Sequence, residues 1–128
     1  MKYTKIYSDD KGETHFKDIN IELKSVEYAP PAPPLLLSKL FPANQYAFTV
    51  FKSGWYGDWH PTPVRQIYFL LSGTLESTVS DGETRVFGSG SIVLVEDTTG
   101  KGHITKVVGT EDVKAVLIQL DSSEPINH

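Results

Sequence analysis

Two histidines and a glutamine carry side chains that together suit metal binding or acid–base chemistry. His60 stands in the stretch GWYGDWHPTPVRQIYFLLSG (residues 54–73), and Gln66 follows it six residues later. His103 comes after a glycine-bearing loop in the second half of the chain. Two imidazoles and a neutral amide oxygen can hold a divalent ion such as Zn, Ni or Cu, although the missing carboxylate lowers the affinity. Alternatively, the three residues are hydrogen-bonded polar groups of a metal-free ligand pocket.

Catalysis without a metal is a further interpretation of the same residues. Two neutral imidazoles that face one cavity can supply a general acid and a general base. Tyr68, two residues after Gln66, can donate a proton or a hydrogen bond, or can simply form an aromatic pocket wall. His60 and Tyr68 are therefore the candidate catalytic residues.

Two tryptophans and a threonine complete the candidate pocket. Trp55 and Trp59 precede His60, and Thr62 follows it. Trp side chains at the mouth of a barrel can stack on a flat ligand, or they can cap the core or bury a subunit interface. Trp55, Trp59 and Thr62 are accordingly the candidate ligand-pocket residues.

A strand is the element that would position these side chains. Side chains alternate between the two faces of a strand, so a regular strand over residues 60–70 places His60, Thr62, Gln66 and Tyr68 on one face. Arg65 falls on the opposite face, where a structural ion pair is its expected role. Apolar residues also alternate on that opposite face, which predicts a strand with one face in a barrel interior and the other against a second sheet or another subunit.

Strand patterns dominate the chain, and no segment shows helical periodicity. The predicted strands are residues 5–8, 19–24, 46–52, 64–71, 74–80, 84–87, 91–96, 103–108 and 113–120. Asp81-Gly82 between two of them predicts a hairpin with a type I′ turn. The loop 96–102 reads as a solvated turn; alternatively, its carboxylates and the glycine-flanked Lys101 could gate the pocket. Eight or nine short strands in one small domain indicate an all-β double-sheet barrel or jelly roll.

Prolines mark the segment before the first long strand. Pro30, Pro31, Pro33 and Pro34 exclude a helix and favour extended polyproline II conformation. We expect the stretch YAPPAPPLLLSKLFPA (residues 28–43) to form a rigid arm laid over the body, with leucines 35–37 as apolar anchors.

Composition limits the classes of partner. The chain has 128 residues, a formal net charge of −4 and no cysteine. One domain is expected at this length. The absence of a basic stripe argues against nucleic acid as a partner. No apolar run is long enough for a membrane span, and residues 1–12 lack the apolar region of a signal peptide, so we expect a cytoplasmic protein with no membrane partner.

The spacing around His60 resembles the first motif of the cupin superfamily. That motif runs Gly, five residues, His-x-His, three or four residues, Glu, six residues, Gly. Here Gly54, His60 and Gly73 keep the frame, while Thr62 stands at the second His position and Gln66 at the Glu position.

The spacing before His103 is similar to the second cupin motif. Gly90 is followed by Glu96 in the usual proline position, then by a lengthened loop that leads to His103, with Val107 in the usual Asn position. The combination resembles small single-domain bacterial cupins of mostly unassigned activity.

The resemblance implies a cupin-type double-stranded β-helix, or jelly-roll barrel. It implies a single domain over residues 1–128, with the N-terminal strands and proline-rich arm in 1–44 and the barrel core in 45–120. It also implies a divalent transition metal (Zn, Ni, Fe or Mn) as a possible cofactor, with His60, Gln66 and His103 as its ligands.

Three hypotheses for function follow. The first is a metal-dependent enzyme acting on a small organic metabolite at the His/Gln/His site. The second is a metal-free module that binds or senses a small molecule. The third is a metal-free isomerase or lyase. The doubly apolar strand and the proline-rich arm, together with the habit of the family, predict a homodimer.

Overall fold

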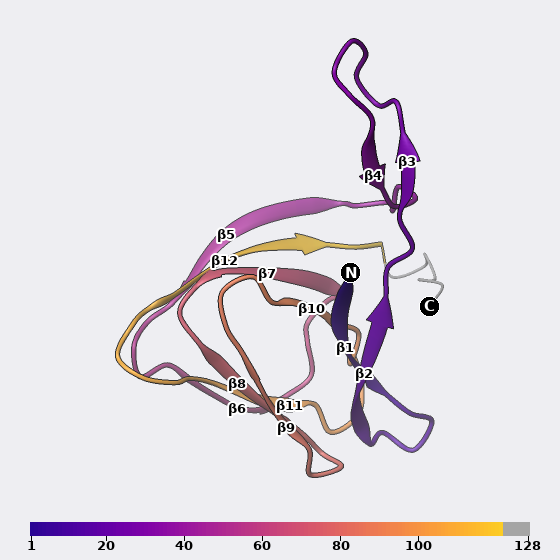
Figure 1. Cartoon of the computed structure of the whole chain (residues 1–128). Coiled ribbons are helices and arrows are strands. Elements are labelled where there is room, and N and C mark those ends of the chain that lie inside the picture. The colour runs from indigo at the N-terminus through magenta and orange to yellow at the C-terminus, as the bar shows by residue number, and fades with distance from the viewer. Residues whose placement is uncertain (122–128) are drawn as a thin grey trace.

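The computed structural model describes residues 1–121, which form twelve β-strands and no helix (Figure 1). The strands are β1 (Lys2–Ser8), β2 (Thr14–Asn20), β3 (Lys24–Val26), β4 (Leu35–Leu37), β5 (Gln45–Phe51), β6 (Tyr56–His60), β7 (Gln66–Ser72), β8 (Leu75–Val79), β9 (Thr84–Phe87), β10 (Ile92–Val95), β11 (His103–Val107) and β12 (Val113–Gln119). The predicted all-β class is confirmed. Strands β3, β4 and β6 were not predicted. Over the described part of the chain there is no helix that could cross a membrane.

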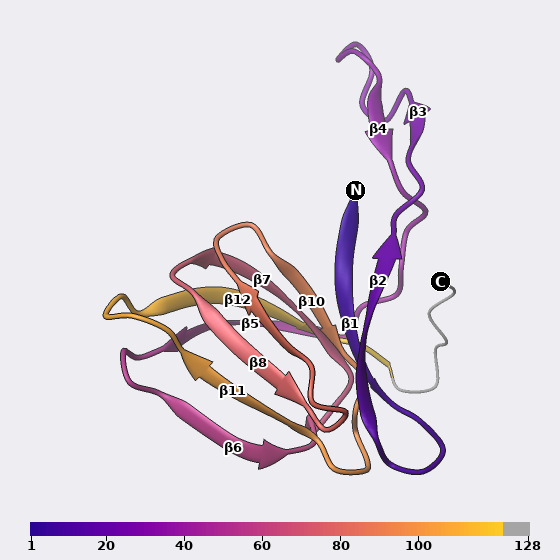
Figure 2. The same ribbon diagram turned by 60° about the horizontal axis from the view of Figure 1, so that its bottom comes forward.

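Two sheets face each other and enclose the core (Figures 1 and 2). The larger sheet has the order β2-β1-β10-β7-β12-β5, and the smaller has the order β6-β11-β8-β9. Apolar side chains from both sheets meet between them, including Ile6, Leu70, Val79, Val93 and Val113. Their removal from water stabilises the closed arrangement. This is the jelly-roll architecture that the strand pattern predicts.

The chain changes sheets between β6 and β7. Strand β6 pairs with β11 in the smaller sheet, whereas β7 pairs with β10 and β12 in the larger sheet. A regular strand over residues 60–70 therefore does not form, whereas the strand predicted over residues 64–71 corresponds to β7. Pro61 and Pro63 lack the N–H groups that a ladder requires, so the chain leaves one sheet at His60 and enters the other at Gln66.

The N-terminal hairpin adds an edge to the larger sheet. Strand β1 runs parallel to β10 and antiparallel to β2, with Tyr3 opposite Ile19. The second N-terminal strand was predicted over residues 19–24, but it spans Thr14–Asn20. A tight turn explains the difference. The Asp9 carboxylate accepts hydrogen bonds from the backbone N–H groups of Lys11 and Glu13, so the chain reverses there and the second strand begins at Thr14.

The proline-rich segment forms the tip of a separate hairpin. Strands β3 and β4 pair with each other, and the hairpin projects away from the barrel (Figures 1 and 2). Because the segment pairs as a separate hairpin, the expectation of a polyproline II arm laid over the body is wrong. Leu35 and Leu36 are exposed on the described chain and do not anchor the segment to the barrel.

The β8–β9 hairpin forms at the position that Asp81-Gly82 predicted. Its turn, however, is not the predicted type I′ turn. Gly82 has a positive φ of 99°, and no non-glycine residue of the described chain has one. The Gly82 N–H donates to the Val79 carbonyl, and the Val79 N–H donates to the Glu83 carbonyl. A type I′ turn requires positive φ at both central residues, so the turn is instead type I followed by a glycine bulge.

Candidate functional site

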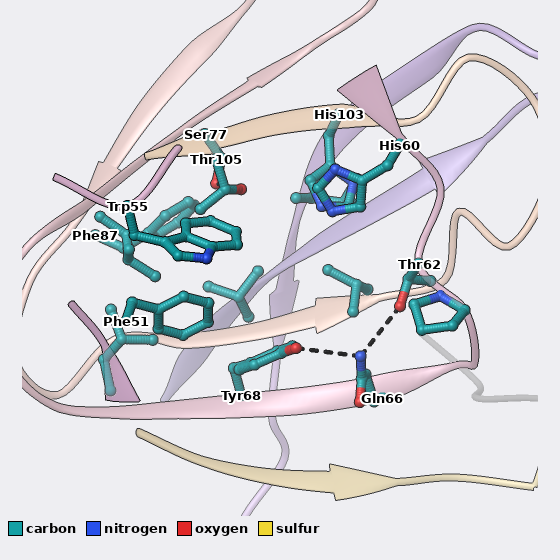
Figure 3. Close-up of a pocket in the computed structure, with 16 residues that line it drawn as sticks. Phe51, Trp55, His60, Thr62, Gln66, Tyr68, Ser77, Phe87, His103 and Thr105 are labelled. Atoms are coloured by element: carbon teal, nitrogen blue, oxygen red, sulfur yellow. Dashed lines mark hydrogen bonds between the residues drawn. The ribbon is translucent and has the colours of Figure 1, made fainter. Parts of the chain in front are cut away.

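A cavity of about 170 Å³ lies between the two sheets and is lined by sixteen residues (Figure 3). Most of the wall is apolar or aromatic. The polar lining side chains fall into three groups: the imidazoles of His60 and His103, the network of Thr62, Gln66 and Tyr68, and the hydroxyl pair of Ser77 and Thr105. This composition, apolar with a few converging polar groups, is typical of small-molecule sites.

Strand pairing brings His60 and His103 together. His60 ends β6 and His103 begins β11, and the antiparallel register places the two residues opposite each other. Their ring centroids are 4.7 Å apart. Figure 3 shows the two imidazoles side by side at one end of the cavity. The two histidines that the sequence singled out thus form one pair.

The outer nitrogen of each imidazole already has a partner. His60 Nδ1 lies 2.5 Å from the backbone carbonyl oxygen of Asp58, and His103 Nδ1 lies 2.6 Å from Asp97 Oδ2. A carbonyl or carboxylate oxygen only accepts, so Nδ1 is the donor in both rings. The Nε2 atoms of His60 and His103 therefore remain to accept a hydrogen bond or a proton from a ligand.

Asp97 is a site residue whose contact with His103 the sequence did not reveal. The loop 96–102 was expected to be solvated, yet the Asp97 side chain is 0% exposed. Its Oδ2 accepts from His103, and its Oδ1 has no hydrogen-bond partner in the described part of the chain. The signal available was an acidic residue six positions before His103 in a glycine-rich loop, but only packing decides whether such a loop is buried.

Glycines allow that loop to pack tightly. Gly102 has a φ of +75°, and a Cβ built there would lie 2.2 Å from the backbone carbon of His60. Gly100 approaches Gly12 of the N-terminal turn in the same way, with its Cβ 2.6 Å from the Gly12 oxygen. The Thr14 hydroxyl donates to the Gly102 carbonyl at 2.7 Å. The segment that carries Asp97 is therefore held between the N-terminal hairpin and the end of β6.

A hydrogen-bond network forms the wall opposite the histidines (Figure 3). The Thr62 hydroxyl donates to the Val64 carbonyl at 2.7 Å, so its oxygen accepts from Gln66 Nε2 at 3.2 Å. Gln66 Nε2 also donates to the Tyr68 hydroxyl oxygen at 3.2 Å. The Tyr68 hydroxyl hydrogen is then available to a ligand. Burial raises the pKa of Tyr68, which keeps this hydroxyl protonated.

The donor set does not fit a resident divalent ion. Residues 1–121 contain no group of three or more His, Cys, Asp or Glu side chains that could hold a metal. Only two of the three predicted ligands, His60 and His103, meet. Gln66 presents its N–H group to Thr62 and Tyr68, and an N–H group cannot ligate a cation. Two imidazoles alone leave half of a four-coordinate shell to solvent.

The two candidate tryptophans lie in different places. Trp55 lines the cavity, and its ring centroid is 4.9 Å from that of Phe51 in an edge-to-face contact. Trp59 is 46% exposed and is not one of the described residues that line the cavity, because it precedes His60 by one position and so points to the other face of β6. The sequence did not single out Phe51, which ends β5 and also lines the cavity.

Arg65 forms the ion pair that its position predicts. Its Nε lies 2.6 Å from Glu96 Oε2, and its Nη1 donates to the Asp121 carbonyl at 2.9 Å. Arg65 is not among the described residues that line the cavity, whereas Gln66 is. Its role is to fasten the crossover between the sheets to β10 and to the end of β12.

Comparison with known proteins finds similarity of fold. No protein-family model matches the chain, and no curated protein matches it in sequence. Among solved structures, a cupin 2 conserved barrel domain protein from Salinispora arenicola is 18% identical, with 81% of this chain and 78% of that chain covered and a TM-score of 0.50. A putative ethanolamine utilization protein Q from Salmonella typhimurium is 12% identical, with 94% and 95% covered and a TM-score of 0.48.

A third similar structure is a predicted oxalate decarboxylase from Thermotoga maritima. It is 16% identical, with 78% of this chain and 93% of that chain covered and a TM-score of 0.48. The likeness to the Salinispora protein agrees with the two facing sheets. The chain is therefore a small protein with the cupin-type β-barrel fold.

Proposed function

We propose that this protein binds a small organic molecule inside its barrel without a resident metal. The observation that carries the proposal is the pairing of His60 with His103, each with Nδ1 already bonded and Nε2 left for a ligand. A hydrogen-bond donor on the ligand, such as a hydroxyl or an amine, would meet these two nitrogens. An acceptor at the other end would meet the Tyr68 hydroxyl.

Cavity size limits the ligand. An apolar cavity of about 150 Å³ holds a molecule of the size of benzene, and the cavity here is about 170 Å³. Trp55 and Phe51 offer aromatic surface to the middle of such a molecule. The proposed ligand is accordingly compact and largely apolar, with a donor at one end and an acceptor at the other.

Metal-free acid–base catalysis is a second candidate, favoured by the Asp97–His103 contact. When His103 Nε2 takes a proton from a bound substrate, the buried Asp97 carboxylate stabilises the resulting imidazolium. Tyr68 can give a proton to the opposite end of the same molecule. An isomerase or lyase uses such a pair of proton transfers. The donor set described above gives less support to the metal-dependent hypothesis.

Ligand-observed NMR with a library of compact molecules tests the proposal. Untagged protein is dialysed against a chelator, and elemental analysis confirms the metal content of each sample. Compounds with a donor and an acceptor at opposite ends are expected to bind, and His60→Ala, His103→Ala and Tyr68→Phe variants are expected to weaken them by about tenfold or more each.

Two tryptophan variants provide a matched control. Trp55→Ala removes a lining side chain and should weaken binding, whereas Trp59→Ala should leave it unchanged because Trp59 lies outside the cavity. Binding that requires added metal would overturn the proposal, as would binding that is insensitive to both histidine variants. Turnover of a bound compound by metal-free protein would select the second candidate.

A further inference from the structure

The wall of the cavity carries no charged side chain of the Lys, Arg, Asp or Glu type among its sixteen described residues. Both N–H groups of the Gln66 amide are already donated, one to Thr62 and one to Tyr68. An anion loses its hydration when it enters such a space, and without a cation or several free donors nothing offsets that loss. The described wall therefore disfavours carboxylates and phosphates as ligands.

Two cations that come near the cavity along the chain are bound elsewhere. Lys5 Nζ lies 3.5 Å and Arg65 Nε lies 2.6 Å from the Glu96 carboxylate. Their chain neighbours Ile6 and Gln66 line the cavity, whereas Lys5 and Arg65 are not among the described residues that do. The positive charge of these two groups is therefore directed to Glu96 and not to a ligand.

A negative charge is buried behind the histidines. The Asp97 side chain is 0% exposed, and its Oδ2 lies 2.6 Å from His103 Nδ1. Within residues 1–121 its Oδ1 is also buried and has no hydrogen-bond partner. A buried carboxylate with so few partners is poorly compensated, and solvent screens its field only weakly. This field extends through the His103 ring to whatever molecule meets Nε2.

The histidine pair offers two acceptors to a ligand. Each Nδ1 is already a donor, so the Nε2 atoms of His60 and His103 carry the free lone pairs, and the ring centroids are 4.7 Å apart. An ammonium group carries three N–H donors and no acceptor, so one such group can donate to both rings. A hydroxyl has a single hydrogen and serves only one of them. Trp55 and Phe51 line the same cavity, and aromatic faces attract cations.

We infer that the ligand of this cavity is a compact primary amine, bound as an ammonium ion with its nitrogen at the His60–His103 pair. The inference rests on the proposed function and specifies the charge of its ligand. An aliphatic amine with a pKa near that of lysine, about 10.4, is protonated at neutral pH. Asp97 then determines specificity without touching the ligand, because its carboxylate offsets the ammonium charge through the His103 ring. A neutral acceptor at the other end of the ligand meets the Tyr68 hydroxyl.

A series of compounds built on one ring tests the charge of the ligand. The amine, the alcohol and the carboxylate of tetrahydropyran, each substituted at the carbon opposite the ring oxygen, share an acceptor at the far end and differ in the group that meets the histidines. Ligand-observed NMR titration of metal-free protein at neutral pH measures their Kd values. We expect the amine to bind at least about tenfold more tightly than the alcohol, and the carboxylate to show no detectable binding.

Asp97→Asn tests the source of this preference. The amide has the same size but no charge, so the ratio of amine affinity to alcohol affinity should fall by about tenfold or more. Glu76→Gln is the matched control. It also removes one negative charge, from a β8 side chain that pairs with Lys106 and is not among the described residues that line the cavity, so the ratio should not change.

The outcomes separate this inference from the proposed function. Alcohol or carboxylate binding as tight as that of the amine would overturn the inference and leave the proposed function standing. An amine preference that persists in the Asp97→Asn protein, with an unaltered circular dichroism spectrum, would overturn the role of Asp97. If that variant does not fold, the comparison of amine with alcohol on the unaltered protein still decides the ligand class. Failure of this series and of the donor–acceptor library to bind would overturn both proposals.

Discussion

Asp97 Oδ2 lies 2.6 Å from His103 Nδ1, and the Asp97 carboxylate is fully buried. The contact joins a loop to the first residue of β11, and it determines which imidazole nitrogen faces the cavity. His60 reaches the same result with a different partner, the backbone carbonyl of Asp58. This difference makes the two histidines separable by mutation.

Asp97→Asn should mix the tautomers of His103. The Asn amide can either accept from Nδ1–H or donate to an unprotonated Nδ1, so the preference for Nδ1–H weakens. Imidazole ¹⁵N NMR measures the change. Asp97→Ala should in addition lower the free energy of unfolding by about 1–3 kcal/mol, because a buried Nδ1–H loses its partner.

Asp58→Asn is the control for this experiment. The bond to His60 uses the backbone of Asp58, so the tautomer of His60 should not change, and neither should that of His103. If His103 remains in the Nδ1–H tautomer in the Asp97→Asn protein to the same extent as in the unaltered protein, the Asp97 carboxylate does not select the tautomer.

Gln66→Glu should strengthen metal binding. The substitution adds a carboxylate to the cavity that both imidazoles line, and a carboxylate is a ligand for divalent ions whereas the present N–H group is not. Isothermal titration with Zn²⁺ on untagged protein should show at least about a tenfold gain in affinity over the unaltered chain.

The metal content of the unaltered protein completes this test. We expect no stoichiometric transition metal after growth in metal-supplemented medium. Stoichiometric metal that disappears in both His60→Ala and His103→Ala variants would contradict the conclusion drawn from the donor set.

Gly102→Ala should destabilise the protein more than Gly109→Ala. Both glycines have positive φ, which costs an alanine about 1–2 kcal/mol. Only at Gly102 would the new Cβ also collide with backbone, that of His60, while nothing lies within 4 Å of the Cβ at Gly109. Urea denaturation of the two variants isolates the cost of the close approach. Equal losses would show that the loop can move away from His60 freely.

His15 should make stability depend on pH. Hydrogen bonds to Asp9 and then to Asp81 raise the pKa of His15 above its ordinary value of 6.5. The hydrogen bond with His15 is the main cause that holds the pKa of the Asp9 carboxyl below its ordinary value of 3.8. For Asp81, the hydrogen bond from the Glu83 backbone N–H lowers the carboxyl pKa from 3.8 the most, and the hydrogen bond with His15 lowers it further. The His15 contribution is fully present below pH 6.5 and is lost as pH rises through its raised pKa. The carboxylate contribution is present above pH 3.8 and is lost as pH falls through their lowered pKa values.

A His15→Gln variant measures this contribution. Thermal unfolding should show the largest decrease in Tm relative to the unaltered protein between pH 3.8 and 6.5, with the difference shrinking at higher pH. Salt should reduce the effect, because all three groups are near the surface. A difference that is constant with pH would mean that the imidazole acts through packing alone.

Much of the inner wall of the site could be predicted from strand periodicity. His60, Thr62, Gln66 and Tyr68 all line the cavity, as one face of a strand requires. The agreement is partly fortuitous, because the chain changes sheets at residues 61–65. Two facing sheets of a closed barrel share one interior, so residues on both sides of the crossover still point inward.

The second N-terminal strand and the arm were predicted less well. Their placement depends on which segment pairs with which: Tyr3 with Ile19, and Lys24 with Leu37. Local propensity carries little information about such pairing, since an apolar run can serve in several registers.

The sequence by itself determined the class of fold, the face of the barrel strands that turns inward and the identity of the two histidines, because alternation and turn residues act over short distances. Only the tertiary structure decided that Asp97 is buried against His103 and that Gln66 presents its N–H group to Thr62 and Tyr68. The burial of Asp97 depends on segments far apart in the chain, such as Gly100 against Gly12 and Gly102 against His60. Contacts of that kind are settled by packing in three dimensions, and no local pattern in the sequence records them.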